Sequence, residues 1–294
     1  MKSVAIYILL LTILLTSCVK TAEYPIGTDI KRPVLYSFIN NNEIGVQLYW
    51  SRLLSEEGNK QTINNATVML FEDDDYKGEM AFISDGYYKM NSFIPGANKE
   101  YKLLVDVPDY GEISAETRMP NEINPVFNLT IIEDSSSVIL NQVFSDLAGI
   151  ENFYFTNVKL LLYFGNNVID TTILIELSSP MHDNLYNEKG TLFHDRMIDG
   201  QNYNCIINIE NYYFNYYDGE NHEHVYCDSA IIIPQFRIIN KDFYHFYIDV
   251  MIQNYNNENA FSEPYPIHCN IVNGYGIMGA YFEYSDSLKH IPIH

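Results

Sequence analysis

Short stretches of alternating apolar and polar residues constrain the fold of this chain most. The clearest is 44–52, whose alternate residues form one apolar face: Ile44, Val46, Leu48 and Trp50. A period of two is typical of a strand with one buried face. Asn, Asp and Gly residues separate this stretch from others like it, as turns between strands would require. The pattern predicts an all-β protein.

Seven stretches of this kind fill the first part of the chain. They are predicted at 34–39, 44–52, 66–72, 80–84, 87–93, 100–107 and 113–119. Because turn signals lie between these short strands, they favour an immunoglobulin-like β-sandwich over 34–120. Residues 120–125, with a proline at either end, are the predicted boundary.

The second part has longer strand-like stretches and one helix. The strands are predicted at 126–133, 138–146, 153–164, 169–177, 203–217 and 225–239. Over 241–255, apolar residues recur three or four apart, which is the spacing of one helix face. Asn240 suits the N-cap of this helix, and Asn256 with Asn257 suits its end. We predict a second β-sandwich-like domain over 121–294, with the helix covering one face of its sheet.

Composition agrees with strands and excludes some partners. The chain has 25 Tyr and 16 Phe, residue types that favour strands. Its 17 Lys and Arg stand against 38 Asp and Glu, which gives a formal charge of -21. This charge repels nucleic acid and anionic lipid, so no nucleic-acid partner is predicted.

The amino-terminal residues form a predicted export signal. Lys2 precedes an apolar run over 4–15, which is too short to cross a bilayer as a stable helix. The segment ends in Leu-Thr-Ser-Cys18, which is similar to a bacterial lipobox and implies lipid attachment at Cys18. An ordinary signal peptide with an incidental cysteine is the alternative. We predict a cleaved leader at 1–17 and a lipidated tether at 18–33 that anchors the chain to a membrane.

Three cysteines remain if Cys18 carries lipid, namely Cys205, Cys227 and Cys269. A disulfide between Cys205 and Cys227 is one interpretation, since they are the nearest pair along the chain. A simple hairpin turn at 218–221 would, however, place them several residues out of register. Three buried free thiols are the favoured interpretation.

Four stretches occur in an order that resembles one known family. Residues 260–281, AFSEPYPIHCNIVNGYGIMGAY, resemble its closing signature, and three earlier stretches agree: 84–88, 100–120 and 192–201 (LFHDRMIDGQ). The family is one of Bacteroidetes lipoproteins, with domain of unknown function 4249. The resemblance covers nearly the whole mature chain.

This resemblance implies a two-domain β lipoprotein of the outer membrane, often encoded beside a TonB-dependent receptor. It implies no reaction. The tether contains Glu23 and Asp29 rather than the acidic cluster that often follows the lipidated cysteine in surface-exposed Bacteroidetes lipoproteins. The cell-surface side of the outer membrane is favoured over the periplasmic side.

Two clusters are candidate metal sites. His222 and His224 flank Glu223, and on a strand both imidazoles would share a face and could bind Zn²⁺ or Cu²⁺. The acidic run 72–75 could bind Ca²⁺, but it lacks the spacing and the glycine of a calcium loop. In both places a solvated hairpin end is the favoured interpretation.

Two further segments carry residues with possible chemistry. His194, Asp195 and Arg196, with Asp199 nearby, combine groups that could do acid–base work. No nucleophile motif accompanies them, so a loop held by an Asp–Arg pair and a turn-capping Asp is favoured. The glycines of 273–279 match a phosphate loop only superficially, and tight turns at positive φ explain them better.

A run of aromatic residues is the candidate ligand platform. On a strand, Tyr212, Phe214 and Tyr216 would share one face, and Tyr213 and Tyr217 the other. Two aromatic faces cannot both be ordinary core, so one could contact a sugar ring, a peptide or a partner protein. Core tyrosines with satisfied hydroxyls are the alternative.

Three functions follow from these patterns. We favour a binding or accessory lipoprotein that captures a ligand or caps a TonB-dependent receptor, with no enzyme activity and no cofactor. A metal-binding or hydrolytic surface enzyme is one alternative, and it depends on the histidine clusters. A structural or adhesive surface protein is the other.

Overall fold

The structure is a computed structural model, and it describes residues 31–52, 58–132, 137–173, 186–187, 190–218, 223–257, 263 and 265–290. The predicted leader, Cys18 and the tether as far as residue 30 lie outside the described residues. Within those residues, no helix is both long and apolar enough to cross a membrane. In the described part of the chain, strands dominate and one α-helix accompanies them, so the predicted all-β class is confirmed.

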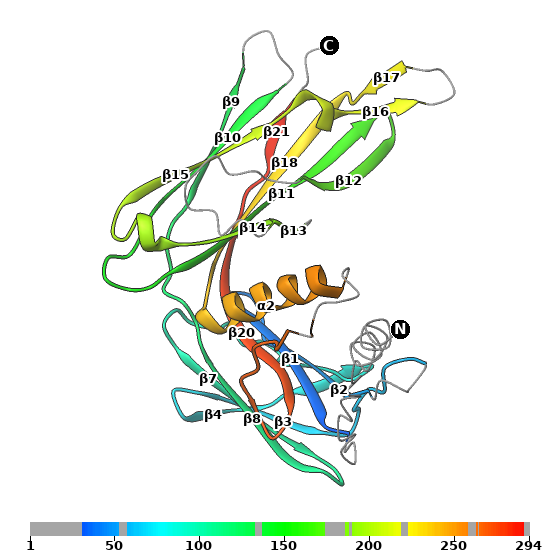
Figure 1. Cartoon of the computed structure of the whole chain (residues 1–294), viewed down its shortest axis with the longest axis vertical. Helices are drawn as coiled ribbons and strands as arrows, with labels where there is room; N and C mark the ends of the chain where they lie inside the picture. The colour runs from blue at the N-terminus through cyan, green and yellow to red at the C-terminus, as the bar shows by residue number, and fades with distance from the viewer. Residues whose placement is uncertain are drawn as a thin grey trace, which may run out of the picture.

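The amino-terminal half is a β-sandwich (Figure 1). Its strands are β1 (Pro33–Asn40), β2 (Gly45–Trp50), β3 (Thr67–Glu72), β4 (Asp75–Glu79), β5 (Ala81–Ser84), β6 (Tyr87–Lys89), β7 (Glu100–Val107) and β8 (Gly111–Arg118). One sheet holds β1, β2, β6 and β5, and the other holds β8, β7, β3 and β4. All seven predicted strands of this half are present, and β4 is an additional one.

The predicted alternation in β2 is confirmed by burial. Val46 and Leu48 are fully buried, whereas Gln47 and Tyr49 on the opposite face are only partly buried. Fully buried residues of the other sheet, such as Leu103, belong to the same hydrophobic cluster. Burial of each such side chain contributes about 2 kcal/mol, so this cluster is what holds the two sheets together.

The carboxy-terminal half has longer strands. They are β9 (Val126–Ile131), β10 (Val138–Ser145), β11 (Phe153–Phe164), β12 (Asn167–Ile173), β13 (Tyr186–Asn187), β14 (Gly190–His194), β15 (Asn202–Ile209), β16 (Asn215–Asp218), β17 (Glu223–Tyr226), β18 (Ser229–Ile239) and β21 (Leu288–His290). A three-stranded sheet, β15-β10-β9, packs against the large sheet. Phe144 of β10 contacts Tyr154 and Phe236 of that sheet, with ring centroids 4.8 and 4.7 Å away.

One long strand joins the two halves. β20 (Tyr275–Ser285) pairs in parallel with β1, where Tyr36 faces Ile277, and then antiparallel with β18, where Ile238 faces Phe282. β19 (Ile271–Val272) pairs with β8. The large sheet therefore runs through the whole molecule, as Figure 1 shows. Residues of the predicted carboxy-terminal domain, 121–294, thus contribute one strand to each sheet of the amino-terminal sandwich.

The helix α2 (Lys241–Asn257) covers the junction of the two halves, and the prediction of a helix over 241–255 is confirmed. Its N-cap is Asn240, whose side-chain oxygen accepts a hydrogen bond from the Phe243 N–H at 3.0 Å. Phe243 packs closely on Gly279 of β20, where an added Cβ would lie 3.0 Å from that of Phe243. The helix therefore rests on β20, the long strand that pairs with both halves.

Candidate functional site

The predicted histidine cluster is only partly described. His222 lies outside the described residues, and His224 is an exposed residue of β17. Its Nδ1 lies 2.9 Å from the side-chain oxygen of Asn215 on the neighbouring strand β16. The His224 ring thus makes a polar contact between two short hairpin strands.

The acidic run 72–75 forms the turn between β3 and β4. Asp73 and Asp74 have positive φ, a conformation that Asp tolerates better than most residues. Asp73 accepts a hydrogen bond from the Glu100 N–H at 3.0 Å and pairs with Lys99 at 2.6 Å. The Asp73 carboxylate therefore holds this hairpin end against the start of β7.

The aromatic run does not form one strand, which corrects the prediction of a continuous strand over 203–217. β15 ends at Ile209, and the 3-10 helix η2 (Asn211–Phe214) separates it from β16. A 3-10 helix has three residues per turn, so the period of two is lost across this segment. The expected pair of flat aromatic faces is therefore absent from the described part of this run.

The aromatic side chains have different environments as a result. Tyr212 is 62% exposed, whereas Phe214 is fully buried. Tyr213 is partly buried against the core, and its ring centroid lies 4.2 Å from that of Tyr212. Tyr216 is exposed, follows Asn215 in β16 and pairs with Val225 of β17. The side chain of Tyr217 is outside the described set.

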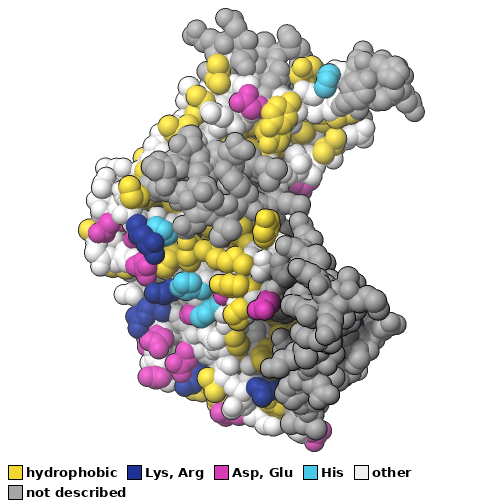
Figure 2. Space-filling view, viewed as in Figure 1, with side chains coloured by type: hydrophobic (Ala, Val, Ile, Leu, Met, Phe, Trp, Pro, Cys, Tyr) yellow, Lys and Arg dark blue, Asp and Glu magenta, His cyan; other side chains and the backbone are white. Residues whose placement is uncertain are grey.

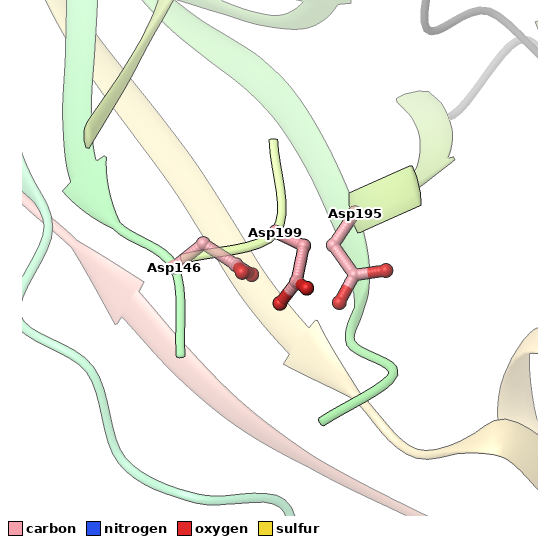
Figure 3. Close-up of side chains that lie close together, drawn as sticks. All are labelled: Asp146, Asp195 and Asp199. Atoms are coloured by element: carbon pink, nitrogen blue, oxygen red, sulfur yellow. The ribbon is translucent and has the colours of Figure 1, made fainter. Parts of the chain in front are cut away.

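Three carboxylates meet beside the loop of residues 192–201, which has the sequence LFHDRMIDGQ (Figure 3). Asp146 follows β10, Asp195 begins the 3-10 helix η1 (Asp195–Met197), and Asp199 lies in the turn after it. One carboxylate oxygen from each lies within 4.8 Å of the others. Asp146 and Asp195 are buried, and Asp199 is exposed. An all-oxygen set of this kind is the type that a hard cation such as Ca²⁺ prefers.

Backbone donors already bind these carboxylates. Asp146 accepts a hydrogen bond from the Gly200 N–H at 2.8 Å, Asp195 accepts one from Asn152 at 2.7 Å, and Asp199 accepts one from Gly149 at 2.7 Å. The cluster therefore joins two loops of the carboxy-terminal half. We assign it to holding the loop of residues 192–201 in place.

Burial raises the pKa of the Asp195 carboxyl. The hydrogen bond from the Asn152 N–H lowers this pKa, and the nearby Asp146 carboxylate raises it. His194, beside it, accepts a hydrogen bond from the Arg196 N–H through Nδ1 at 3.2 Å. The side chains of His194 and Asp195 thus both accept hydrogen bonds from backbone N–H groups.

All three described cysteines are free thiols. Cys205 and Cys227 are fully buried, as predicted, but Cys269 is exposed. Cys269 lies in the segment between α2 and β19, whose neighbours are also partly or fully exposed. The prediction of three buried thiols is therefore wrong for Cys269.

A pocket of about 370 Å³ lies beside α2 and is the candidate ligand site. Its lining comes from six separate stretches of the chain: Val34, Tyr36, Tyr49, Trp50, Ser51, Arg52, Lys60, Phe246, Ile267, His268, Cys269, Tyr275 and Gly276. Figure 2 shows hydrophobic side chains gathered on the face that α2 crosses, with histidines and cations beside them. The volume falls within the range of small-molecule sites.

Aromatic rings shape this pocket. Tyr36 of β1 and Tyr49 of β2 are stacked, with ring centroids 5.6 Å apart and planes 15° from parallel. The Phe246 ring from α2 meets Tyr36 edge-on at 5.8 Å. Gly276 allows β20 to approach β1 closely, because a Cβ at residue 276 would lie 2.0 Å from the Leu35 carbonyl oxygen. The strands thus form the floor, and the helix forms one wall.

The sequence does not predict this pocket. Its one available signal is Tyr49, a large aromatic residue on the β2 face that the alternation assigns to solvent. Tyr275 and Gly276 join the lining only because β20 returns beside β1. No local pattern predicts that return.

Comparison with known proteins places the chain in a family. No curated protein matches it. A crystal structure of a Corynebacterium diphtheriae protein, whose name describes it as membrane anchored, is similar at 11% identity with a TM-score of 0.22. That match covers 86% of this chain and 59% of the other, so the chain spans less than two thirds of that protein. The family model described as Domain of unknown function (DUF4249) matches residues 20–287, and the chain therefore belongs to the DUF4249 family.

Proposed function

We propose that this chain is a lipoprotein of the outer membrane that binds a small ligand for a TonB-dependent uptake system. The pocket beside α2 is the observation that carries this proposal. It has the size and the aromatic lining of a small-molecule site, and it lies between the amino-terminal sandwich and α2. The lipobox at Cys18 supports attachment to a membrane.

The position of the pocket suits a function near the membrane. Val34 and Tyr36 lie just after the tether, and both line the pocket. The chain from Cys18 to Lys31 reaches at most about 45 Å when fully extended. A ligand held in this pocket would therefore stay close to a receptor in the same membrane, on the surface side in our proposal.

We propose binding rather than catalysis as the activity. An acid–base pair must be able to reach a substrate proton. Asp195 is buried and accepts a hydrogen bond from Asn152, and the His194 Nδ1 accepts one from Arg196. These contacts favour a structural role for the loop of residues 192–201.

Affinity purification of the tagged, lipidated protein from its native cells in mild detergent tests the partner. A TonB-dependent receptor should co-purify in about equal amount, as identified by mass spectrometry. Cys18→Ala is the matched control for the anchor, and it should lose both the acyl mass and the receptor. A wild-type protein that purifies alone would contradict the accessory role.

A further inference from the structure

The pocket has a charge opposite to that of the chain. Its described lining includes Arg52 and Lys60 but neither Asp nor Glu, although the chain has 38 acidic residues and only 17 Lys and Arg. His268 also lines it and lies 2.8 Å from Asp242 through Nε2. At physiological salt the screening length is about 8 Å, so remote carboxylates have little effect on a ligand in the pocket. The nearby Asp242 carboxylate contacts His268, and Lys60 adds a cation to the described lining.

Lys60 is placed where it can contact a ligand. Its Nζ lies 4.9 Å from the centre of the Tyr49 ring, at cation–π distance. Burial raises the pKa of Tyr49, and its hydrogen bond with the Tyr36 hydroxyl raises this pKa further. Tyr49 therefore remains a neutral phenol at physiological pH. A phenol and an ammonium are both donors, and donors suit an anionic group.

The remainder of the lining is largely apolar. Val34 and Tyr275 come from neighbouring strands, Phe246 comes from α2, and Ile267 comes from the segment after it. Apolar and aromatic surfaces of this kind bind the body of a ligand, while a few polar groups fix its orientation. The pocket thus combines an apolar wall with a cationic rim.

We propose that the pocket binds a small organic anion, with an apolar or aromatic body and one carboxylate or sulfonate group. The Lys60 ammonium contacts the anionic group, and Tyr36, Tyr49 and Phe246 contact the body. This inference rests on the proposed binding function and adds the ligand class.

Cys269 provides a reporter within the site. It lines the pocket and is exposed, whereas Cys205 and Cys227 are fully buried. Since thiol reagents need access to sulfur, they should modify Cys269 in the folded protein and spare the other two. A ligand in the pocket should slow this modification.

The test measures the rate of maleimide modification at Cys269 by mass spectrometry, in the lipidated protein in mild detergent. The probes are naphthalene-1-sulfonate and the neutral naphthalene-1-methanol, at equal free concentrations set by dialysis. We expect the sulfonate to protect Cys269 at lower concentration than the alcohol does. Lys60→Met should weaken sulfonate protection about fivefold and leave protection by the alcohol unchanged.

Lys102→Met is the matched control, because it removes the same charge from β7, where Lys102 pairs with Glu116. It should leave protection by both probes unchanged. Equal protection by both probes would overturn the anion preference and leave ligand binding standing. Absence of protection by either probe would overturn the assigned ligand class, whereas receptor co-purification tests the proposed function separately. If Lys60→Met and Lys102→Met weakened sulfonate protection equally, the effect would come from net charge, and the inference would be overturned.

Discussion

Asn240 joins three elements, so its replacement by alanine should destabilise the whole molecule. Its side-chain oxygen accepts hydrogen bonds from the N–H groups of Phe243, at 3.0 Å, and Ala280, at 3.1 Å. Its side-chain nitrogen donates to the Thr117 hydroxyl at 2.5 Å. One residue thus links the start of α2 to β20 and to β8.

The expected loss follows from these three contacts. An N-cap contributes about 1 kcal/mol. Each of the other two hydrogen bonds contributes about 1 kcal/mol, more if a buried partner is left unsatisfied. Asn240→Ala should therefore lower the free energy of unfolding by about 3 kcal/mol, measured by urea denaturation.

Two variants separate the contributions at this position. Asn240→Asp keeps the accepting oxygen and loses the donor to Thr117, so it should lose about 1 kcal/mol. Asn124→Ala, at an exposed site between β8 and β9, should change stability by less than about 0.5 kcal/mol. If Asn240→Ala cost no more than Asn124→Ala, the junction would not depend on Asn240, and the reasoning would be wrong.

Three further predictions concern other parts of the molecule. Burial raises the folded-state pKa of Asp195, so the contribution of this carboxyl to the free energy of unfolding falls as pH rises through that pKa. In urea melts, Asp195→Asn should therefore gain stability relative to the wild type between pH 4 and 7. A constant difference would refute this. Gly276→Ala should cost several kcal/mol, because φ is +111° and the new Cβ would strike the Leu35 carbonyl oxygen; Gly149→Ala, also at positive φ but with open space around it, should cost about 1 kcal/mol. Similar losses in thermal melts would argue against the close approach of β20 to β1. Cys269 should be the only described cysteine that a thiol reagent titrates before unfolding, and early reaction of a second thiol would contradict the buried core.

The sequence predicts elements whose burial is one-sided. β2 is recognisable because one face is buried and the other is not. The helix over 241–255 is recognisable because its apolar residues recur at helical spacing next to a capping Asn240. In both cases the local pattern marks the side that packs against the rest of the molecule.

β20 was not predicted because its burial is two-sided. Residues 277–280 are all buried, so the strand shows no alternation. Its glycines instead predict turns. Gly276 does adopt positive φ, but it does so inside the strand, where it lies against Leu35. Close backbone approach, rather than chain reversal, explains this glycine.

The candidate site was beyond local patterns for a related reason. Tyr49 and Lys60 lie near each other in the sequence, but Phe246 and Tyr275 are far from them, and Tyr275 lies beside Val34 only through the parallel pairing of β1 with β20. The aromatic run near residue 212 was a more visible signal. A short 3-10 helix there buries Phe214 and removes the predicted platform.

The central claim is that the pocket beside α2 holds a small molecule. The most direct test is mass spectrometry of small molecules extracted from the lipidated protein after purification from its native cells. One compound should accompany the wild type and Lys102→Met in about equal amount, and it should be depleted in Tyr49→Ala, whose folding is verified by circular dichroism. The same small molecules in equal amounts from all three proteins would contradict the claim.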